Sequence, residues 1–336
     1  MTIPDPQVVI IDTDPGMGEP GSDIDDGLAI ALALRSPELT VLGLTIVNGN
    51  VDAVTGTDVA RRLVDRLGRP ELPVLMGATE PLSRDMQSVR DMFEAVSPGI
   101  GHGRSKTSAP RGPTEQTHAA RWLVEQVAAR PGEISVLAIG PLTNLALASQ
   151  LDPGFASNVR ELVLMAGSAT TLAQNITVVS DFNAYVDPEA LDTVMRSGAS
   201  VRMVGLDQTS QVMLTREDAA WLRACGSGFG RWVADCADAW IDYLGRAFPQ
   251  RPEHRDACFL HDPLVVAAFI RPELCRWEDA DVRVETSSEL ARGLVVANRG
   301  LALEPMGAPN ARVAVETDVE SFRHFFLKRL GEPRGN

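Results

Sequence analysis

The chain contains 336 residues, of which 44% are hydrophobic and 23% are charged, and its formal net charge at pH 7 is −14. This composition is typical of a globular protein that buries a sizeable core. The negative charge disfavours polyanionic partners, so we expect that neither nucleic acid nor an anionic membrane surface binds to the protein.

Short runs of β-branched and aliphatic residues predict six strands, at 8–11, 40–47, 72–76, 134–140, 161–167 and 201–206. Helical patterns lie between most of these runs, at 51–67, 117–129, 142–151 and 188–197. Continuously apolar strands that alternate with helices are typical of a parallel sheet buried on both faces. We therefore predict an α/β fold with a Rossmann-like core, in which a doubly wound, mostly parallel sheet carries helices on both faces.

The C-terminal third is more mixed, with strand-like runs at 282–285, 294–298 and 312–316 and a closing helix near 319–330. No linker rich in Ser and Gly separates these segments from the rest of the chain. We therefore expect residues 1–336 to form a single domain. The segment 78–113 is long and rich in Gly, Pro and Ser, so it is either a functional lid or disordered.

The four cysteines lie far apart, at positions 225, 236, 258 and 275, without the spacing of a zinc site. They are expected to be free thiols in a reducing compartment. The N-terminus lacks a basic signal-peptide region, and no apolar run is long enough to cross a bilayer. We therefore expect a cytoplasmic protein.

The first strand-to-helix junction, IDTDPGMGEPGSDIDDGLAI at 11–30, allows two opposite interpretations. Gly16, Gly18 and Gly21 form a G-x-G-x-x-G motif between a strand and a helix, as a dinucleotide-binding loop requires. However, carboxylates crowd the place where a phosphate would lie. Pro20 also occupies the turn in which backbone N–H groups would face an anion. The phosphate-loop interpretation is therefore disfavoured.

The same junction carries Asp12 and Asp14 at the strand end and Asp25 and Asp26 at the helix start. Ionised carboxylates that converge raise one another's pKa unless a cation lies among them. Oxygen-only ligands favour Ca²⁺ or Mg²⁺ over zinc. The alternative is ordinary capping, with Asp25 as the N-cap of a helix at 26–34 and Asp26 near its dipole. The combination of D-x-D with D-D favours the metal site.

Three further motifs are each compatible with ordinary turn and cap chemistry. His261 and Asp262 precede an apolar helix, and Asp262 followed by Pro263 resembles an N-cap before the first helical position. Asp181 and Asn183 are expected on a loop, where they either form a turn or present polar groups to a polyhydroxylated ligand. In the third motif, Thr143 and Asn144 lie beside a helix start, as in ordinary turn and cap chemistry. Asp187, which follows Asp181 and Asn183 in the second motif, is expected to cap a helix at Pro188.

Taken in order, these motifs resemble the inosine-uridine-preferring nucleoside hydrolase family, whose members cleave the N-glycosidic bond of ribonucleosides to free base and ribose. The family motif D-x-D-P-G-x-D-D is matched by residues 12–16 and, after an interruption at 17–23, by residues 24–26. Other matches are TIVNGNV at 45–51, AIGPLTNLALA at 138–148, LVLMAG at 162–167, DFNAYVDPEA at 181–190, MVGLDQT at 203–209 and HDPLVVAAF at 261–269. The resemblance covers nearly the whole chain.

The resemblance implies a single Ca²⁺ ion, held by the side chains of Asp14, Asp26 and Asp262 and by the main-chain carbonyl of Thr143, with Asp12 in support. It implies a ribose site formed by Asp25, Asn50, Asn175, Asp181 and Asn183. His261 would donate a proton to the leaving base, and His102 would approach the base. The reaction implied is attack on C1′ by a Ca²⁺-activated water whose proton passes to Asp14.

The resemblance also implies a small-molecule nucleoside substrate, a role in nucleoside catabolism or purine and pyrimidine salvage, and a homodimer or homotetramer. Two departures from the family pattern affect the site. The family has a single residue in place of 17–23, so Glu19 or Asp23 could replace a ligand, and it usually has Glu in place of Asp181.

Two alternatives stay open from the sequence. One is a homologue that binds a nucleoside or ribose without turnover. The other is a Mg²⁺-dependent haloacid-dehalogenase-like phosphatase, because D-x-D after a first strand also supplies a nucleophilic Asp and a metal ligand. Such a phosphatase needs a Lys and a second acidic motif, for which this chain has no obvious counterpart.

Overall fold

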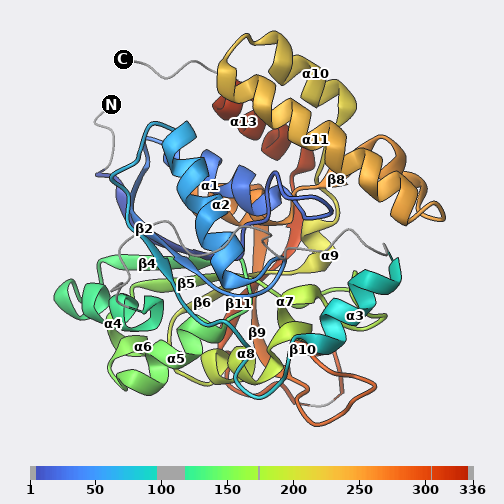
Figure 1. The fold of residues 1–336 in the computed structure, drawn as a ribbon. Helices are drawn as coiled ribbons and strands as arrows, with labels where there is room; N and C mark the ends of the chain where they lie inside the picture. The colour runs from blue at the N-terminus through green and yellow to red at the C-terminus, as the bar shows by residue number, and fades with distance from the viewer. Residues whose placement is uncertain (1–4, 97–117, 173–174, 304, 332–336) are drawn as a thin grey trace.

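The structure is a computed structural model that describes residues 5–96, 118–172, 175–303 and 305–331. Within them a nine-stranded sheet has the order β10-β9-β11-β6-β5-β4-β1-β2-β3 (Figure 1). Its strands are β1 (Gln7–Thr13), β2 (Leu39–Ile46), β3 (Val74–Met76), β4 (Ile134–Ala138), β5 (Glu161–Met165), β6 (Val201–Val204), β9 (Cys275–Val284), β10 (Val295–Asn298) and β11 (Ala311–Thr317). The antiparallel pairs in this sheet are β9 with β10 and β9 with β11. The predicted α/β, mostly parallel architecture is confirmed.

The helices in the described ranges are α1 (Asp25–Leu34), α2 (Ala53–Arg66), α3 (Gln87–Val96), α4 (Ala119–Ala129), α5 (Thr143–Leu151), α6 (Phe155–Asn158), α7 (Phe182–Val186), α8 (Pro188–Met195), α9 (Leu206–Thr209), α10 (Arg216–Ala224), α11 (Gly228–Ala247), α12 (His261–Ile270) and α13 (Val319–Gly331). A small second sheet pairs β7 (Met213–Thr215) with β8 (Ala257–Phe259). Figure 1 shows α10, α11 and α13 together at one end of the molecule. None of the helices in the described part is long and apolar enough to cross a membrane.

Helices cover the sheet on both faces, which explains why its strands are continuously apolar. Along β1, Val9 and Ile11 belong to a core shared with α1, α2 and α12, whereas Ile10 belongs to a second core shared with α4, α5 and α8. All three side chains are fully buried. Alternate residues of a strand point to opposite faces, so each strand needs an apolar residue at every position.

The topology creates a switch point beside β1. The chain passes from β1 to β2 and β3 on one side, and then returns to β4, β5 and β6 on the other. In open sheets of this kind, ligands bind beyond the carboxyl ends of the strands at such a point. The loops that follow β1 and β4 therefore meet at the place where a site is expected.

Several local predictions are corrected by the structure. The N-cap of α1 is Ile24 rather than Asp25, and the N-cap of α12 is Leu260 rather than Asp262; neither cap makes a side-chain hydrogen bond. Asp181 is not in a plain loop, because it N-caps α7 by accepting a hydrogen bond from the Ala184 amide at 3.2 Å. The segment 78–113 contains helix α3, while residues 97–113, including His102, lie outside the described residues.

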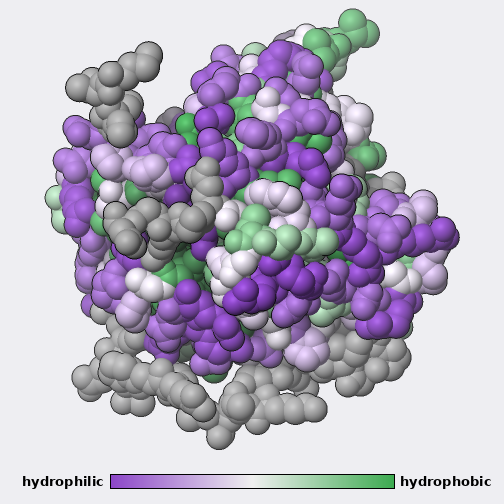
Figure 2. Space-filling view, turned by 90° about the horizontal axis from the view of Figure 1, so that it is seen from above, coloured by the Kyte–Doolittle hydropathy of each residue, from purple (hydrophilic) through white to green (hydrophobic). Residues whose placement is uncertain are grey.

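The surface fits the acidic, charged composition of the chain. Figure 2 shows one face on which hydrophilic side chains predominate, with small hydrophobic patches between them. All four cysteines are free, as predicted.

Candidate active site

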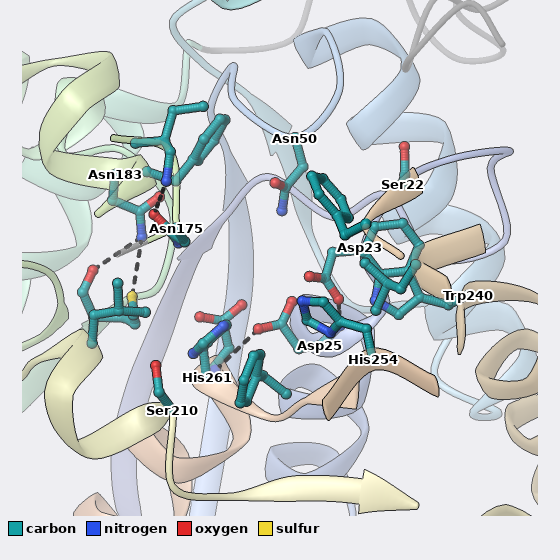
Figure 3. A pocket seen from close by; sticks show the side chains of 18 of the residues that line it. Ser22, Asp23, Asp25, Asn50, Asn175, Asn183, Ser210, Trp240, His254 and His261 are labelled. Atoms are coloured by element: carbon teal, nitrogen blue, oxygen red, sulfur yellow. Dashed lines mark hydrogen bonds between the residues drawn. The ribbon is translucent and has the colours of Figure 1, made fainter. Parts of the chain in front are cut away.

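A pocket with a volume of about 200 Å³ lies beyond the carboxyl ends of β1, β4 and β5. Its two sides differ in chemistry. Figure 3 shows Asn175 and Asn183 on one side, Trp240 and His254 on the other, and Asp25 and Asn50 between them. Phe93 and Phe182 also line the pocket. We call the side with Asn175 and Asn183 the polar side and the side with Trp240 and His254 the aromatic side.

Three buried carboxylates converge at the floor of this pocket. Asp25 and Asp26 open α1, Asp262 is the second residue of α12, and these two helices pack against each other. One oxygen of each residue lies within 4.8 Å of the others, and all three side chains are at most 4% exposed. Neither Asp25 nor Asp262 is the N-cap of its helix. The Asp25 carboxylate accepts from the amides of Asp26 at 3.1 Å and Asp262 at 3.4 Å, and these contacts hold it beside the other two carboxylates.

Asp14 adjoins this cluster through Asp26. The Asp14 amide donates to Asp26 Oδ1 at 3.1 Å, and the Thr13 hydroxyl donates to the same oxygen. Asp14 Oδ2 accepts from the Asn50 amide at 2.6 Å. The loops beside β2 and β4 approach so closely that a Cβ on Gly140 would lie 2.6 Å from Asp14 Oδ1, and a Cβ on Gly49 would come closer still to Oδ2.

Burial raises the pKa of Asp14, Asp25 and Asp262 well above the usual range of a carboxyl, and neighbouring carboxylates raise it further. Asp26 also has a raised pKa, caused by burial and only partly opposed by its hydrogen bonds. Such a cluster ionises readily only if a cation lies within it. The donors are all oxygen atoms, which fit a hard divalent cation such as Ca²⁺ or Mg²⁺.

Asp12 lies behind the cluster and does not line the pocket. Its Oδ2 accepts from the Thr45 hydroxyl at 2.5 Å and from Asn144 Nδ2 at 2.9 Å. Its Oδ1 is buried and has no hydrogen-bond partner among the described residues. Asn144 also donates to the Ile46 carbonyl and accepts from the Ala78 amide, so it ties together the ends of β1, β2 and β3.

Thr143 is the first residue of α5, directly after the β4 loop. Its hydroxyl donates to Asp187 Oδ2 at 2.7 Å. Asp187 caps α8 through the Ala190 amide at 3.0 Å, as predicted, and also accepts from the Leu82 amide at 2.8 Å. Asp187 therefore fixes the start of α5, where the Thr143 carbonyl lies.

Four of the five residues assigned to ribose line the pocket, namely Asp25, Asn50, Asn175 and Asn183. Asn50 Nδ2 donates to Asp26 Oδ2 at 2.9 Å, and Asn183 Nδ2 donates to the carbonyls of Ile139 and Met165. Asn175 lines the polar side of the pocket. These amides are held in place by hydrogen bonds or stand at the pocket edge, as a site for hydroxyl groups requires.

Asp181 differs from the others because it does not line the pocket. Its Oδ2 accepts from the Gly167 amide at 2.6 Å, while Oδ1 caps α7. Burial raises the pKa of this carboxyl to about 6. Asp181 thus fixes the helix that carries Asn183.

His261 lines the pocket next to Asp262. Its Nδ1 is 2.8 Å from the Thr209 hydroxyl, which is in α9. Burial lowers the pKa of His261 to about 4, so the imidazole is neutral at pH 7. If the Thr209 hydroxyl donates to Nδ1, the ring proton is on Nε2.

The interruption at 17–23 forms one edge of the site. Gly18 and Gly21 have φ values of +92° and +71°, so these glycines serve a turn. Glu19 forms an ion pair with Arg62 on α2, away from the carboxylate cluster. Asp23 lines the pocket, and its Oδ1 accepts from the Ile24 amide at 2.6 Å.

Sequence reasoning missed the aromatic side of the pocket, formed by Trp240, Phe248, His254 and Phe259. These residues come from α11 and from the segment between α11 and α12. The sequence marks these residues only by the number of ring-containing side chains between positions 240 and 259. An ordinary hydrophobic core would produce the same pattern.

The chain is similar to known proteins in both sequence and structure. A family model described as inosine-uridine preferring nucleoside hydrolase matches residues 9–324. The probable uridine nucleosidase 2 of Arabidopsis thaliana is 35% identical, over 99% of this chain and 100% of that protein. A solved plant nucleoside hydrolase has a TM-score of 0.84 and 33% identity, over 98% of this chain and 100% of the other. A solved purine-preferring ribonucleoside hydrolase from Gardnerella vaginalis has a TM-score of 0.82 and 30% identity, over 97% and 98% of the two chains.

Proposed function

Because the chain belongs to the inosine-uridine-preferring nucleoside hydrolase family and is an enzyme that hydrolyses nucleosides, we propose that it cleaves ribonucleosides to base and ribose with Ca²⁺ at its carboxylate cluster. The observation that supports this proposal best is the buried convergence of Asp25, Asp26 and Asp262 within 4.8 Å. Asp14 is not one of these three residues but adjoins them, because its amide donates to Asp26 Oδ1. Family membership disfavours the phosphatase, and the names of the similar proteins, which are nucleosidases and nucleoside hydrolases, favour an enzyme over a non-catalytic binder.

The residues proposed to hold the ion are Asp14, Asp26 and Asp262, with the main-chain carbonyl of Thr143. A divalent cation held there would supply Lewis acidity, which makes a water molecule a better nucleophile near pH 7. Asp14 lies beside the cluster, where its Oδ2 accepts from the Asn50 amide. A cation in the cluster would keep the Asp14 carboxylate ionised, so that it can accept a proton from the attacking water. Asp12 holds the strand end behind Asp14.

The ribose is proposed to lie over the cluster, with its hydroxyls bound by Asp25, Asn50, Asn175 and Asn183. Asp181 acts from behind by fixing Asn183. Breaking the C1′–N bond builds positive charge on the sugar and negative charge on the base. The carboxylates around the sugar therefore bind the transition state more tightly than the substrate.

His261 is proposed to assist the departing base. Because burial keeps its imidazole neutral, we infer that it stabilises the developing charge by a hydrogen bond from Nε2–H. His102 is also retained as a proposed base contact, on the family resemblance alone. The resemblance likewise supports a homodimer or homotetramer and a single domain, and the free thiols support a reducing, cytoplasmic location.

The decisive experiment measures reducing sugar released from a panel of purine and pyrimidine nucleosides. We expect activity on at least one nucleoside, its loss on chelation, and its recovery with Ca²⁺ more than with Mg²⁺. Asp14→Ala should lower kcat by roughly 10²–10⁴-fold, because a general base is removed.

Asp65→Ala, a change of the same kind on an exposed position of α2, is the matched control and should retain full activity. Calcium binding measured by calorimetry gives a readout that does not depend on turnover. Activity that persists in chelator with no calcium bound would contradict the metal assignment, and absence of release from every nucleoside would contradict the substrate class.

A further inference from the structure

The aromatic side of the pocket has no role in the steps described above. Trp240 lies on α11, Phe248 directly follows that helix, and Phe259 lies on β8, all lining the pocket. His254, in the 3₁₀ turn Pro252–Arg255, stands between Phe248 and Phe259. Its ring centroid is 6.0 Å from that of Phe248 and 5.5 Å from that of Phe259, which it meets edge-on at 80°. The ring orientation of His254 is thus set by packing.

His254 is unusual because it is a polar ring in this apolar setting. It is only 5% exposed, and its Nδ1 is buried with no hydrogen-bond partner in the part of the chain that the structure describes. Leaving such an atom unpaired costs free energy, so it needs an explanation. Burial and the nearby Arg251 lower the pKa of His254. The neutral imidazole therefore offers one donor and one acceptor.

The position of His254 relative to the sugar residues identifies what it contacts. In Figure 3 it lies across the pocket from Asn175 and Asn183, beyond Asp25. A nucleoside whose ribose occupies the polar side must direct its base toward Trp240 and His254. A base has flat faces that stack on aromatic rings and an edge of hydrogen-bonding groups.

We propose that His254 is a specificity-determining residue, whose imidazole hydrogen-bonds to the polar edge of the nucleobase while Trp240, Phe248 and Phe259 pack against the rest of the base. This inference rests on the proposed function, because it needs the ribose on the polar side. A site built to hydrogen-bond its substrate discriminates strongly against analogues that lack the partner.

The test compares two substrates of the full-length enzyme in calcium-containing buffer. One is the nucleoside cleaved fastest in the panel, and the other is 4-nitrophenyl β-D-ribofuranoside, whose leaving group has no base edge. His254→Phe retains a flat ring and removes the hydrogen bond. We expect kcat/KM for the nucleoside to fall about tenfold, as for the loss of one hydrogen bond, and kcat/KM for the nitrophenyl riboside to stay within about twofold of the wild type.

A second measurement separates binding of the base from assistance to its departure. Competitive inhibition by the free base should weaken about tenfold in His254→Phe, again as for one hydrogen bond, while inhibition by ribose should not change. His254→Gln restores a donor and an acceptor and should recover part of the nucleoside activity. His324→Phe, on the exposed side of α13, is the matched control and should leave every value at the wild-type level.

The proposal is overturned if His254→Phe lowers kcat/KM equally for the nucleoside and the nitrophenyl riboside, or if inhibition by the free base is unchanged. It is also overturned if the Gln variant loses as much nucleoside activity as the Phe variant. Failure of the proposed function would give a different result, because the wild-type enzyme itself would then release no sugar from any nucleoside.

Discussion

At the scale of single residues, the contact between Thr209 and His261 offers a direct test of how the base departs. The hydroxyl of Thr209 holds Nδ1 of His261 at 2.8 Å. Thr209→Val keeps the side-chain shape but removes this partner. We expect kcat for nucleosides to fall about five- to tenfold, the equivalent of roughly 1 kcal/mol for one hydrogen bond, because the ring is no longer held in one tautomer.

Hydrolysis of 4-nitrophenyl riboside, whose leaving group needs no assistance, should be unaffected by Thr209→Val. Thr57→Val is the control, because Thr57 is also buried but its hydroxyl bonds only to the Ala53 carbonyl within α2. If Thr209→Val lowers kcat equally for nucleosides and for 4-nitrophenyl riboside, Thr209 acts on the shape of the pocket and not through His261.

The sequence identified most of the polar residues of this site but could not decide their roles. Aspartate before or at a helix start serves equally as a cap and as a ligand, so Asp25 and Asp262 were ambiguous. The structure resolves this, because Ile24 and Leu260 occupy the cap positions. His254 could not be predicted, since a histidine in a Pro-Glu-His-Arg turn is buried only through packing against Phe248 and Phe259.

At the scale of elements, the packing of the interruption against α1 is tested by Gly27→Ala. Replacement of a helical glycine by alanine usually stabilises a protein by roughly 0.5–1 kcal/mol. Here the added Cβ would lie 2.5 Å from Met17 Sδ and 2.8 Å from Met17 Cβ. We expect overpacking to dominate and the free energy of unfolding in urea to fall by about 1–3 kcal/mol.

Gly245→Ala provides the matched control in helix α11. There the nearest atom to the new Cβ is the His254 carbonyl at 3.6 Å, an ordinary contact. This variant should be as stable as the wild type or more stable. If Gly27→Ala also proves stabilising, the segment 17–23 moves freely and does not pack on α1.

Asp187 links three elements near the proposed metal, and its removal should have a larger effect than loss of an ordinary cap. Asp187→Ala leaves Thr143, Leu82 and Ala190 without their acceptor. We expect the free energy of unfolding, measured in urea, to fall by about 2–4 kcal/mol, because a helix cap is lost and buried donors lose their partner. Calcium affinity measured by calorimetry should also fall.

The control for Asp187→Ala is Asp52→Ala. Asp52 caps α2 through Thr55 and does not line the pocket. Asp52→Ala should lower the free energy of unfolding by only about 1 kcal/mol and leave the calcium affinity unchanged. Equal effects of the two substitutions would mean that Asp187 is no more than a helix cap.

The strands of the parallel core were predictable from the sequence because burial on both faces leaves a continuous apolar run. Strands β7 and β8 were not, since three residues each carry too little pattern. The pairing of β9 with β11 was also unpredictable. Local sequence shows that a strand exists but not which distant strand it joins.

At the scale of the whole molecule, the acidic cluster should control stability. Burial raises the pKa of Asp12 to about 7, from a usual value of 3.8. The folded protein without a metal therefore holds this proton up to a higher pH than the unfolded chain does. By linkage, the stability from this group is fully present below pH 3.8 and is lost as the pH rises through about 7. The raised pKa values of Asp14, Asp25 and Asp262 act in the same direction.

Chelated protein should consequently have a higher Tm near pH 6.5 than near pH 8. Burial lowers the pKa of His254, His118 and His261, which favours the opposite trend. That effect is small in this window, which begins at the ordinary pKa of histidine. With calcium bound, the Tm should instead be higher near pH 8 than near pH 6.5. Calcium competes with protons for the carboxylates, so it stabilises the folded state more at the higher pH. Thermal unfolding at both pH values, with chelator and with calcium, measures this directly. A chelated protein that is more stable near pH 8 would show that the carboxylates are already ionised and compensated without a cation.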